Sequence, residues 1–339
     1  MNLSNERILI VGGTGSLGQA LIKRLRTQNE VVVFSRDELK QWSLRNEIKD
    51  DSVSFFVGDM RDRQRLEEVL LTTLPTVVVI AAALKQVDTC EMAPGESIKT
   101  NVLGVQNLVE VTERNLARLE GLKTVVMVST DKACEPTNVY GMSKALAERI
   151  VTSRSYLHEG IRFVAVRYGN VLESRGSIIP LFRHQVDHAP ALTLTHPEMT
   201  RFAMTLGDSI DLILTAATRG GSGETWIPRL GSMRIRDLAE IFSRRSGKPV
   251  KEIGMRPGEK LHEMLISRPE SLRARTVDDF YVLDSALAPI ASDAQTFEYS
   301  SGQDVLSQEA LETYLTGLGV IDMEMDQFVG TRLDDIRQD

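Results

Sequence analysis

The stretch ILIVGGTGSLG, residues 8–18, decides the fold of this chain. Four apolar residues lead into a G-x-x-G-x-x-G turn, and an amphipathic segment follows directly over residues 17–28. This order predicts a buried strand, a tight turn and a helix, whose glycines let the backbone approach a pyrophosphate at the helix N-terminus. The turn residues expected to bind a dinucleotide are Gly12, Thr14, Gly15, Ser16, Leu17 and Gly18.

Five further apolar runs repeat the strand pattern. Each is short and bounded by turn residues, as is typical of buried strands in a parallel sheet. Amphipathic segments such as residues 61–71 lie between them. The alternation predicts right-handed βαβ units and an α/β fold with a Rossmann-type doubly wound parallel sheet. The runs are residues 31–34, 53–57, 77–80, 124–128 and 163–166.

The pattern changes in the second half of the chain. Loops lengthen, prolines become frequent, and helical patterns remain at residues 208–217 and 235–243. We expect an NADP-binding Rossmann domain over residues 1–170, with later segments returning to it. Residues 171–339 are expected to form mainly a smaller C-terminal substrate-binding lobe, followed by an acidic tail that packs loosely.

The composition argues against several classes of protein. The formal net charge of −7 over 339 residues disfavours broad nucleic-acid binding. Cys90 and Cys134 have no metal-ligand spacing and His262 has no partner cluster, so no metal site is expected. The N-terminus is unlike a signal peptide, and no run approaches about 20 apolar residues. We therefore expect a soluble, cytoplasmic protein that does not bind a membrane.

The end of the second strand indicates which dinucleotide is bound. Ser35 and Arg36 lie where NAD sites usually place an acidic residue, whereas an arginine suits the 2′-phosphate of NADP. Asp37 follows one position later and leaves NAD open, but Arg36 with Lys40 favours NADP.

Residues after the third and fourth strands are also expected to contact this cofactor. The first group is placed to meet the adenine, and the second is small enough to let the cofactor cross the sheet edge. They are Asp59 and Met60, then Ala81, Ala82 and Ala83.

Tyr140 and Lys144 are four residues apart, so a helix would place them on one face. A phenol with a reference pKa of about 10 is a poor base, but a nearby ammonium and a nicotinamide's positive charge favour the phenolate. The phenolate can take a proton from a substrate hydroxyl while hydride leaves the same carbon, and Thr130 can hydrogen-bond that oxygen. The pair predicts hydride transfer and contact with the cofactor.

Asp131 and Lys132 follow the run that ends at Ser129, at the carboxyl end of a strand where α/β proteins bind ligands. An acid and a base of this kind have no role in simple redox chemistry. A chain with both sets of residues is expected to oxidise a sugar, eliminate water from it and reduce it again. The plain alternative is a solvated salt bridge in a loop.

Motifs spread over both halves of the chain are specific in combination. They are AALKQV (residues 82–87), STDKA (129–133), RYGNV (167–171), PEMTRF (197–202) and RPGEKLHE (256–263). With the glycine turn and the Tyr–Lys pair, they resemble the extended short-chain dehydrogenase/reductase superfamily. Within it, the chain is similar to bacterial UDP-N-acetylglucosamine 4,6-dehydratases over about residues 6–285. The closest likeness is to the soluble, C5-inverting group that opens the pseudaminic acid pathway.

The resemblance implies a lyase that works on a UDP-sugar with bound NADP, in a homo-oligomer that is a dimer or a hexamer. Tyr140 would deprotonate the 4-hydroxyl during hydride transfer from C4. Lys132, if neutral, would remove the C5 proton, and Asp131, if protonated, would donate to the departing 6-hydroxyl. The implied product is UDP-2-acetamido-2,6-dideoxy-β-L-arabino-hex-4-ulose.

Recognition of the UDP-sugar is expected to fall mainly to the second lobe. An arginine suits a diphosphate, a carboxylate suits ribose hydroxyls, and a lysine or asparagine suits the sugar or a phosphate. The residues assigned to this role are Lys85, Asn170, Arg201, Arg256 and Glu259. Asp88 and Glu173 depart from the family pattern, which usually has Pro and Gly there, so the identity of the sugar stays open.

Three alternative functions remain. A 4,6-dehydratase that retains C5 configuration would use the same residues. A UDP-hexose 4-epimerase would use the Tyr–Lys pair without elimination, and Asp131 with Lys132 disfavours it. A non-catalytic NADP sensor on the same fold is disfavoured because the chain keeps both Tyr140 and Lys144.

Overall fold

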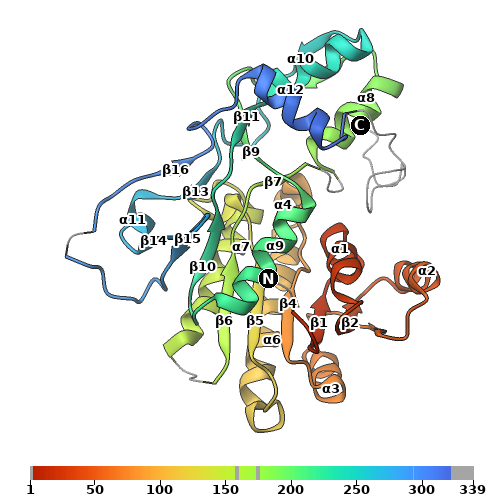
Figure 1. Cartoon of the computed structure of the whole chain (residues 1–339), viewed down its shortest axis with the longest axis vertical. Coiled ribbons are helices and arrows are strands. Elements are labelled where there is room, and N and C mark those ends of the chain that lie inside the picture. The colour runs from red at the N-terminus through yellow and green to blue at the C-terminus, as the bar shows by residue number, and fades with distance from the viewer. Residues whose placement is uncertain (1–2, 157–159, 173–175, 293, 322–339) are drawn as a thin grey trace.

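The computed structural model describes residues 3–156, 160–172, 176–292 and 294–321. Within these residues a nine-stranded sheet forms the centre, in the order β14-β15-β10-β6-β5-β4-β1-β2-β3 (Figure 1). The neighbours from β3 to β10 pair in parallel, whereas β15 and β14 add an antiparallel edge. The strands are β1 (Arg7–Val11), β2 (Glu30–Ser35), β3 (Val53–Val57), β4 (Val77–Ile80), β5 (Thr124–Val128), β6 (Arg162–Val166), β10 (Thr225–Pro228), β14 (Ala274–Val277) and β15 (Phe280–Leu283).

The order of the strands fixes where a ligand can bind. Strand β1 lies between β2 and β4, so the chain runs outward on both sides of it. Such a reversal opens a crevice at the carboxyl ends of the strands, where doubly wound folds bind their ligands. The α/β Rossmann-type fold expected from the sequence is confirmed, and β10, β14 and β15 show that the second half of the chain adds three strands to it.

Helices cover both faces of the sheet (Figure 1). One face carries α1 (Ser16–Leu25), α2 (Glu38–Ile48) and α9 (Leu206–Arg219), and the other carries α3 (Arg63–Thr73), α6 (Gly104–Arg114) and α7 (Val139–Thr152). Each face has its own apolar core. The expected helix over residues 208–217 is α9, but it packs on the sheet beside α1 rather than in the smaller lobe, because its buried face joins the core of the first face.

Short helices connect these elements. Helices α4 (Val87–Met92) and α5 (Pro94–Ser97) and a π-helical turn (Ile98–Leu103) link β4 to α6. Three further single turns are 3₁₀-helical: Leu116–Arg118, Asp131–Ala133 and Ser153–Tyr156.

The smaller lobe lies above the sheet in Figure 1 and has its own core, in which Phe182 and Phe242 contact each other with ring centroids 5.7 Å apart. Its helices are α8 (Ile178–His188), α10 (Ile235–Ser246) and α12 (Gln308–Gly317), whereas α11 (Arg268–Ser271) lies beside β14 and β15 (Figure 1). Its strands are β7 (Asn170–Val171), β8 (Leu192–Leu194), β9 (Thr200–Met204), β11 (Ser232–Arg234), β12 (Val250–Glu252), β13 (Met264–Ile266) and β16 (Tyr299–Ser300). The acidic tail expected to pack loosely lies almost wholly outside the described residues.

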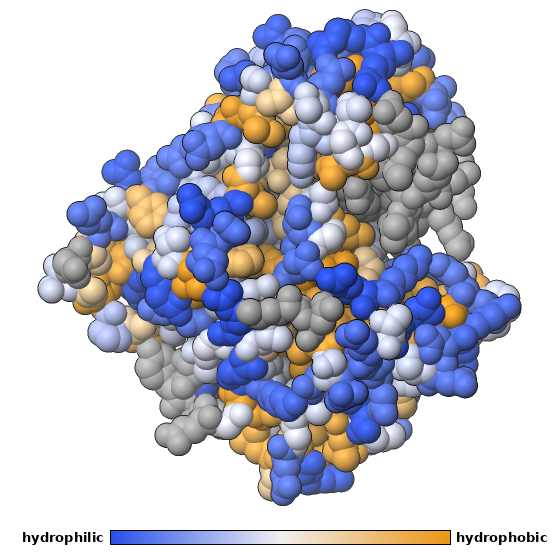
Figure 2. All heavy atoms as spheres, viewed as in Figure 1, coloured by the Kyte–Doolittle hydropathy of each residue, from blue (hydrophilic) through white to orange (hydrophobic). Residues whose placement is uncertain are grey.

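The surface in Figure 2 is mostly hydrophilic, with smaller apolar areas between the charged side chains. Among the described helices, none has the length and apolar character needed to cross a membrane.

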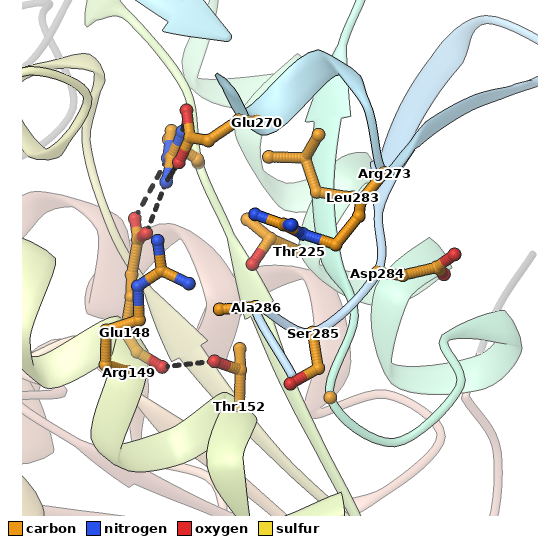
Figure 3. Close-up of a pocket in the computed structure, with 12 residues that line it drawn as sticks. Glu148, Arg149, Thr152, Thr225, Glu270, Arg273, Leu283, Asp284, Ser285 and Ala286 are labelled. Carbon is orange, nitrogen blue, oxygen red and sulfur yellow. Dashed lines mark hydrogen bonds and ion pairs between the residues drawn. The ribbon is translucent and has the colours of Figure 1, made fainter. Parts of the chain in front are cut away.

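A buried ion-pair network ties the sheet to the smaller lobe. Arg167 follows β6 and is 3% exposed. Its guanidinium donates to Glu148 of α7 at 2.6 Å and to Glu270 of α11 at 2.8 Å, and it also reaches the Leu265 carbonyl at 2.9 Å. Figure 3 shows the side chains of Glu148 and Glu270 pointing toward one another. The arginine lowers the pKa of Glu270 to about 2, against the opposing effect of burial.

Candidate active site

A cavity of about 960 Å³ lies between the glycine turn, the carboxyl ends of β4, β5 and β6, and the lobe segment 253–263. This volume is at the upper end of the range for small-molecule sites. All five residues assigned to catalysis line it, namely Thr130, Asp131, Lys132, Tyr140 and Lys144. So do all five assigned to the substrate, namely Lys85, Asn170, Arg201, Arg256 and Glu259.

The residues assigned to the cofactor divide into two groups. Those that line the cavity are Gly12, Gly15, Ser16, Leu17, Gly18, Ala81 and Ala83, together with Tyr140 and Lys144. Those that lie outside its lining are Thr14, Ser35, Arg36, Lys40, Asp59, Met60 and Ala82. Met60 is 3% exposed and packs in the core beneath α6, close to Gly104. Its side chain is therefore a core residue, and the role assigned to it near an adenine stays a prediction.

The glycine turn has the close packing that a dinucleotide site needs. Gly12 has a φ of 90°, and a Cβ there would lie 2.6 Å from the Ala82 nitrogen. A Cβ on Gly18 would lie 2.5 Å from the Gly13 Cα. Gly15 caps the N-terminus of α1 and has no side chain to cover the first turn of that helix. The turn can therefore receive an anionic group at close range.

Arg36 and Asp37 have different surroundings. The Asp37 carboxylate caps α2 by accepting a hydrogen bond from the Lys40 nitrogen at 2.9 Å. The Arg36 side chain is 52% exposed and lies 3.7 Å from the Asp59 carboxylate. Asp37 is thus engaged by its own helix, whereas Arg36 extends beside the end of β2.

Tyr140 and Lys144 lie on α7, as the spacing predicts, and each has other polar partners. The Lys144 ammonium donates to the Val128 carbonyl at 2.6 Å, and burial lowers its pKa to about 8. Burial raises the pKa of Tyr140 to about 12, and the groups that oppose this are Lys132 and a hydrogen bond with Thr130. The effect of Lys144 on the phenolate therefore stays a prediction, with the ammonium held by the backbone of β5.

A buried cluster of two carboxylates and one ammonium lies beside Tyr140. The Lys132 Nζ is 3.1 Å from Asp131 Oδ1 and 3.1 Å from Glu263 Oε1. The Thr130 hydroxyl donates to the same Asp131 oxygen at 2.9 Å. Asp131 and Glu263 are 1% and 2% exposed, so both carboxylates are almost completely buried in the protein. Glu263 precedes β13 in the other lobe, and the sequence analysis assigned it no role.

The cluster controls which of its groups are charged. Burial raises the pKa of Asp131, and the Glu263 carboxylate adds to this effect, so Asp131 is suited to hold a proton. Burial alone would lower the pKa of Lys132, but the two carboxylates outweigh it and raise that pKa well above its usual value. The condition that Lys132 is neutral at rest is therefore wrong, because its partners favour the ammonium.

Several polar atoms on the cavity wall are buried and accept or donate no hydrogen bond within the described part of the chain. They are Ser129 Oγ, Asp131 Oδ2, Asn170 Oδ1 and Glu263 Oε2. A buried polar atom without a partner is costly, so these four atoms are places where the wall of the cavity is incompletely satisfied among the described residues.

The lobe segment that closes the cavity is held against α7. Asn138 caps α7 by accepting from the Gly141 nitrogen at 2.8 Å, and its amide donates to the Gly258 carbonyl at 2.9 Å. The Glu259 carboxylate accepts from the Arg256 nitrogen at 3.0 Å and so shapes its own turn. The contact places Arg256 and Glu259 opposite the helix that carries Tyr140.

Other predicted residues lie behind or beside the wall. The Arg201 guanidinium donates to the Thr200 carbonyl at 2.7 Å and lies 3.9 Å from Glu263, so part of its role is to support that carboxylate. Asp88 lines the cavity, and Glu173 lies outside the described residues. His262 lies 2.8 Å from the Thr200 hydroxyl, and no group of three or more potential metal ligands occurs in the described ranges.

Comparison with known proteins identifies the relatives of this chain. The family model described as "Polysaccharide biosynthesis protein" matches residues 8–285. A UDP-glucose 4-epimerase of Rickettsia prowazekii is 39% identical over 289 residues, which cover 82% of each chain. A UDP-N-acetylglucosamine 4,6-dehydratase (inverting) of Campylobacter jejuni is 35% identical over 296 residues, which cover 86% of each.

A further relative and a solved structure match most of the chain. A protein of Methanocaldococcus jannaschii named as an uncharacterized membrane protein is 40% identical over 293 residues, covering 82% of this chain and 86% of that protein. The X-ray structure of Pen from Bacillus thuringiensis superposes with a TM-score of 0.85 at 33% identity, covering 94% of this chain and all of the other. The named relatives thus include both nucleotide-sugar dehydratases and epimerases.

Proposed function

Because the chain belongs to the polysaccharide biosynthesis protein family and is an extended short-chain dehydrogenase/reductase, we propose that it is a UDP-N-acetylglucosamine 4,6-dehydratase that inverts C5. The proposed product is UDP-2-acetamido-2,6-dideoxy-β-L-arabino-hex-4-ulose. The proposed cofactor is NADP, which the glycine turn and Arg36 fit by their geometry and charge.

The observation that carries the proposal is the buried cluster of Asp131, Lys132 and Glu263 beside Tyr140. A 4-epimerase needs only proton transfer at O4 and hydride transfer at C4. Elimination of water across C5 and C6 needs in addition an acid for the departing hydroxyl and a base for the C5 proton. The cluster supplies both at the cavity wall, and burial raises the pKa of the acid, which favours its protonated form.

Each residue has a defined task on this proposal. When bound, NADP⁺ supplies a hydride acceptor that later returns the hydride, and a positive charge that lowers the Tyr140 pKa. Tyr140 takes the proton from O4. The Thr130 hydroxyl forms hydrogen bonds with both Tyr140 and Asp131. Asp131 donates to the departing 6-hydroxyl, and Lys132 removes the proton from C5. Asn170 and Arg256 bind the UDP-sugar at the opposite wall.

The mass of the product distinguishes the main alternatives. Incubation with UDP-N-acetylglucosamine is expected to give a product that has lost one water, as measured by mass spectrometry. An isomer of unchanged mass would contradict the proposal and support a 4-epimerase. The Rickettsia prowazekii relative is named as such an enzyme.

Arg36→Ala is expected to weaken NADP binding by about 30-fold and to change NAD binding by less than about threefold, because only NADP carries the 2′-phosphate that a guanidinium can pair with. The measurement is the Kd of each cofactor by calorimetry. Arg236→Ala removes an exposed arginine of α10 that pairs with Glu240 and is the matched control. Equal losses for both cofactors in the Arg36 variant would contradict the assignment of NADP.

A further inference from the structure

Glu263 has no role in the reaction as derived above, yet it lies within the reacting cluster. Its Oε1 is 3.1 Å from the Lys132 Nζ, and its Oε2 is buried at the cavity wall with no partner in the described part of the chain. The Glu263 nitrogen donates to the Ser301 hydroxyl at 2.9 Å, which fixes the backbone at this point. The carboxylate is therefore held at one oxygen by Lys132, and its other oxygen is buried without a hydrogen bond among the described residues.

The charged groups around Glu263 come from several segments. Lys132 lies on the turn after β5, Arg201 lies on β9 with its Nε at 3.9 Å, and Lys260 lies on the same loop as Glu263. These three cations lower the pKa of Glu263, against the opposing effect of burial. The nearby acids are Asp131 and Tyr140, and burial raises the pKa of both. Burial therefore favours the protonated form of Asp131, while Lys132 and Glu263 favour each other's charged forms, the ammonium and the carboxylate.

Resting on the proposed dehydration, we propose that Glu263 is a positioning residue that accepts the ammonium proton of Lys132 once the sugar fills the cavity, so that Lys132 meets C5 as a neutral amine. The reason is electrostatic. A sugar that fills the cavity expels water, and loss of water disfavours an ion pair relative to the neutral pair formed by one proton transfer. The two atoms are already within hydrogen-bond distance, so the transfer needs no rearrangement.

The step balances in protons and electrons. An N–H bond of the ammonium breaks and an O–H bond forms on Glu263. The Lys132 amine then takes the C5 proton, the C5–H electron pair becomes the C5=C6 bond, and the C6–O bond breaks as Asp131 donates its proton and water leaves. A bound NADPH would supply hydride to C6, and C5 would then take a proton from water on its opposite face. Glu263 releases its extra proton to solvent, and the Tyr140 proton returns to Asp131 through Thr130.

The pH dependence of Glu263→Gln tests this directly. In the wild type the proton moves within the pair, so kcat for dehydration is expected to be flat across neutral pH. In the variant Lys132 must lose its proton to solvent, so kcat is expected to fall about 100-fold near pH 7 and to rise about tenfold per pH unit. KM for UDP-N-acetylglucosamine is expected to change by less than about threefold, because Glu263 acts on Lys132. A purely structural role would lower kcat without adding a slope.

Two further variants complete the experiment. Glu263→Ala with added formate is expected to regain activity and a flat profile, and it provides the test if the glutamine variant does not fold. Glu120→Gln changes an exposed carboxylate in the loop before β5 and is the matched control. A glutamine variant with wild-type kcat, or with a flat profile, would overturn the role of Glu263 while the proposed function stands. A wild type that forms no dehydrated product would overturn both.

Discussion

Lys132→Ala is expected to lower the rate of dehydration about 1,000-fold and to leave cofactor binding within about threefold of the wild type. Lys132 lies on the turn after β5 and contacts Asp131 and Glu263, whereas the glycine turn lies on another wall of the cavity. An alanine there removes the base for C5 and leaves two buried carboxylates without their cation. The measurement is the initial rate of formation of the dehydrated product, with the Kd of NADP determined on the same sample.

Lys99→Ala is the matched control, because Lys99 is an exposed lysine that pairs with Glu96 at 2.8 Å on the protein surface. Its rate is expected to equal that of the wild type. Wild-type turnover in the Lys132 variant would remove Lys132 from the mechanism and leave the cluster as a structural ion pair.

Arg167→Met is expected to lower the free energy of unfolding by about 3–5 kcal/mol, because it leaves Glu148 and Glu270 buried without their shared cation. The arginine joins α7, α11 and the end of β6, so the loss also loosens the lobe from the sheet. Urea denaturation followed by circular dichroism measures the change. Arg268→Met, which breaks an exposed pair with Glu298, is expected to cost less than about 1 kcal/mol.

The same pair makes the effect depend on pH. The folded-state pKa of Glu270 is about 2, below its usual value of 4.5, so its contribution to stability is full above pH 4.5 and is lost as pH falls towards 2. The difference between the wild type and Arg167→Met is therefore expected to shrink over that window. A variant as stable as the wild type at neutral pH would show that the network does not hold the two lobes together.

Local patterns in the sequence were sufficient for six of the nine strands of the sheet and for the helix of the redox pair. The apolar run before Gly12 became β1, and the four-residue spacing placed Tyr140 and Lys144 on α7. Both features depend on residues that are near neighbours in the chain, so the sequence itself shows their periodicity. The helical pattern that became α9 was visible in the sequence, but its place on the sheet was not, because an amphipathic pattern shows that a face is buried and not what covers it.

The charge state of the site depends on a contact that no local pattern reveals. Glu263 is far from Lys132 in the chain, and only the folded chain brings the two to 3.1 Å. The one signal available was its position at the end of the motif RPGEKLHE, which carries the family resemblance but does not indicate a role for this glutamate. Lys144 is similar, because its bond to the Val128 carbonyl depends on how α7 packs against β5.

Proton NMR of the purified protein with UDP-N-acetylglucosamine in D₂O, with NADP bound, tests the central claim most directly. The account predicts a new C6 methyl signal, deuterium at C5, and couplings in the sugar ring that correspond to an inverted C5. A methyl signal with C5 configuration retained would contradict the inversion, and a new sugar without a methyl signal would contradict dehydration itself.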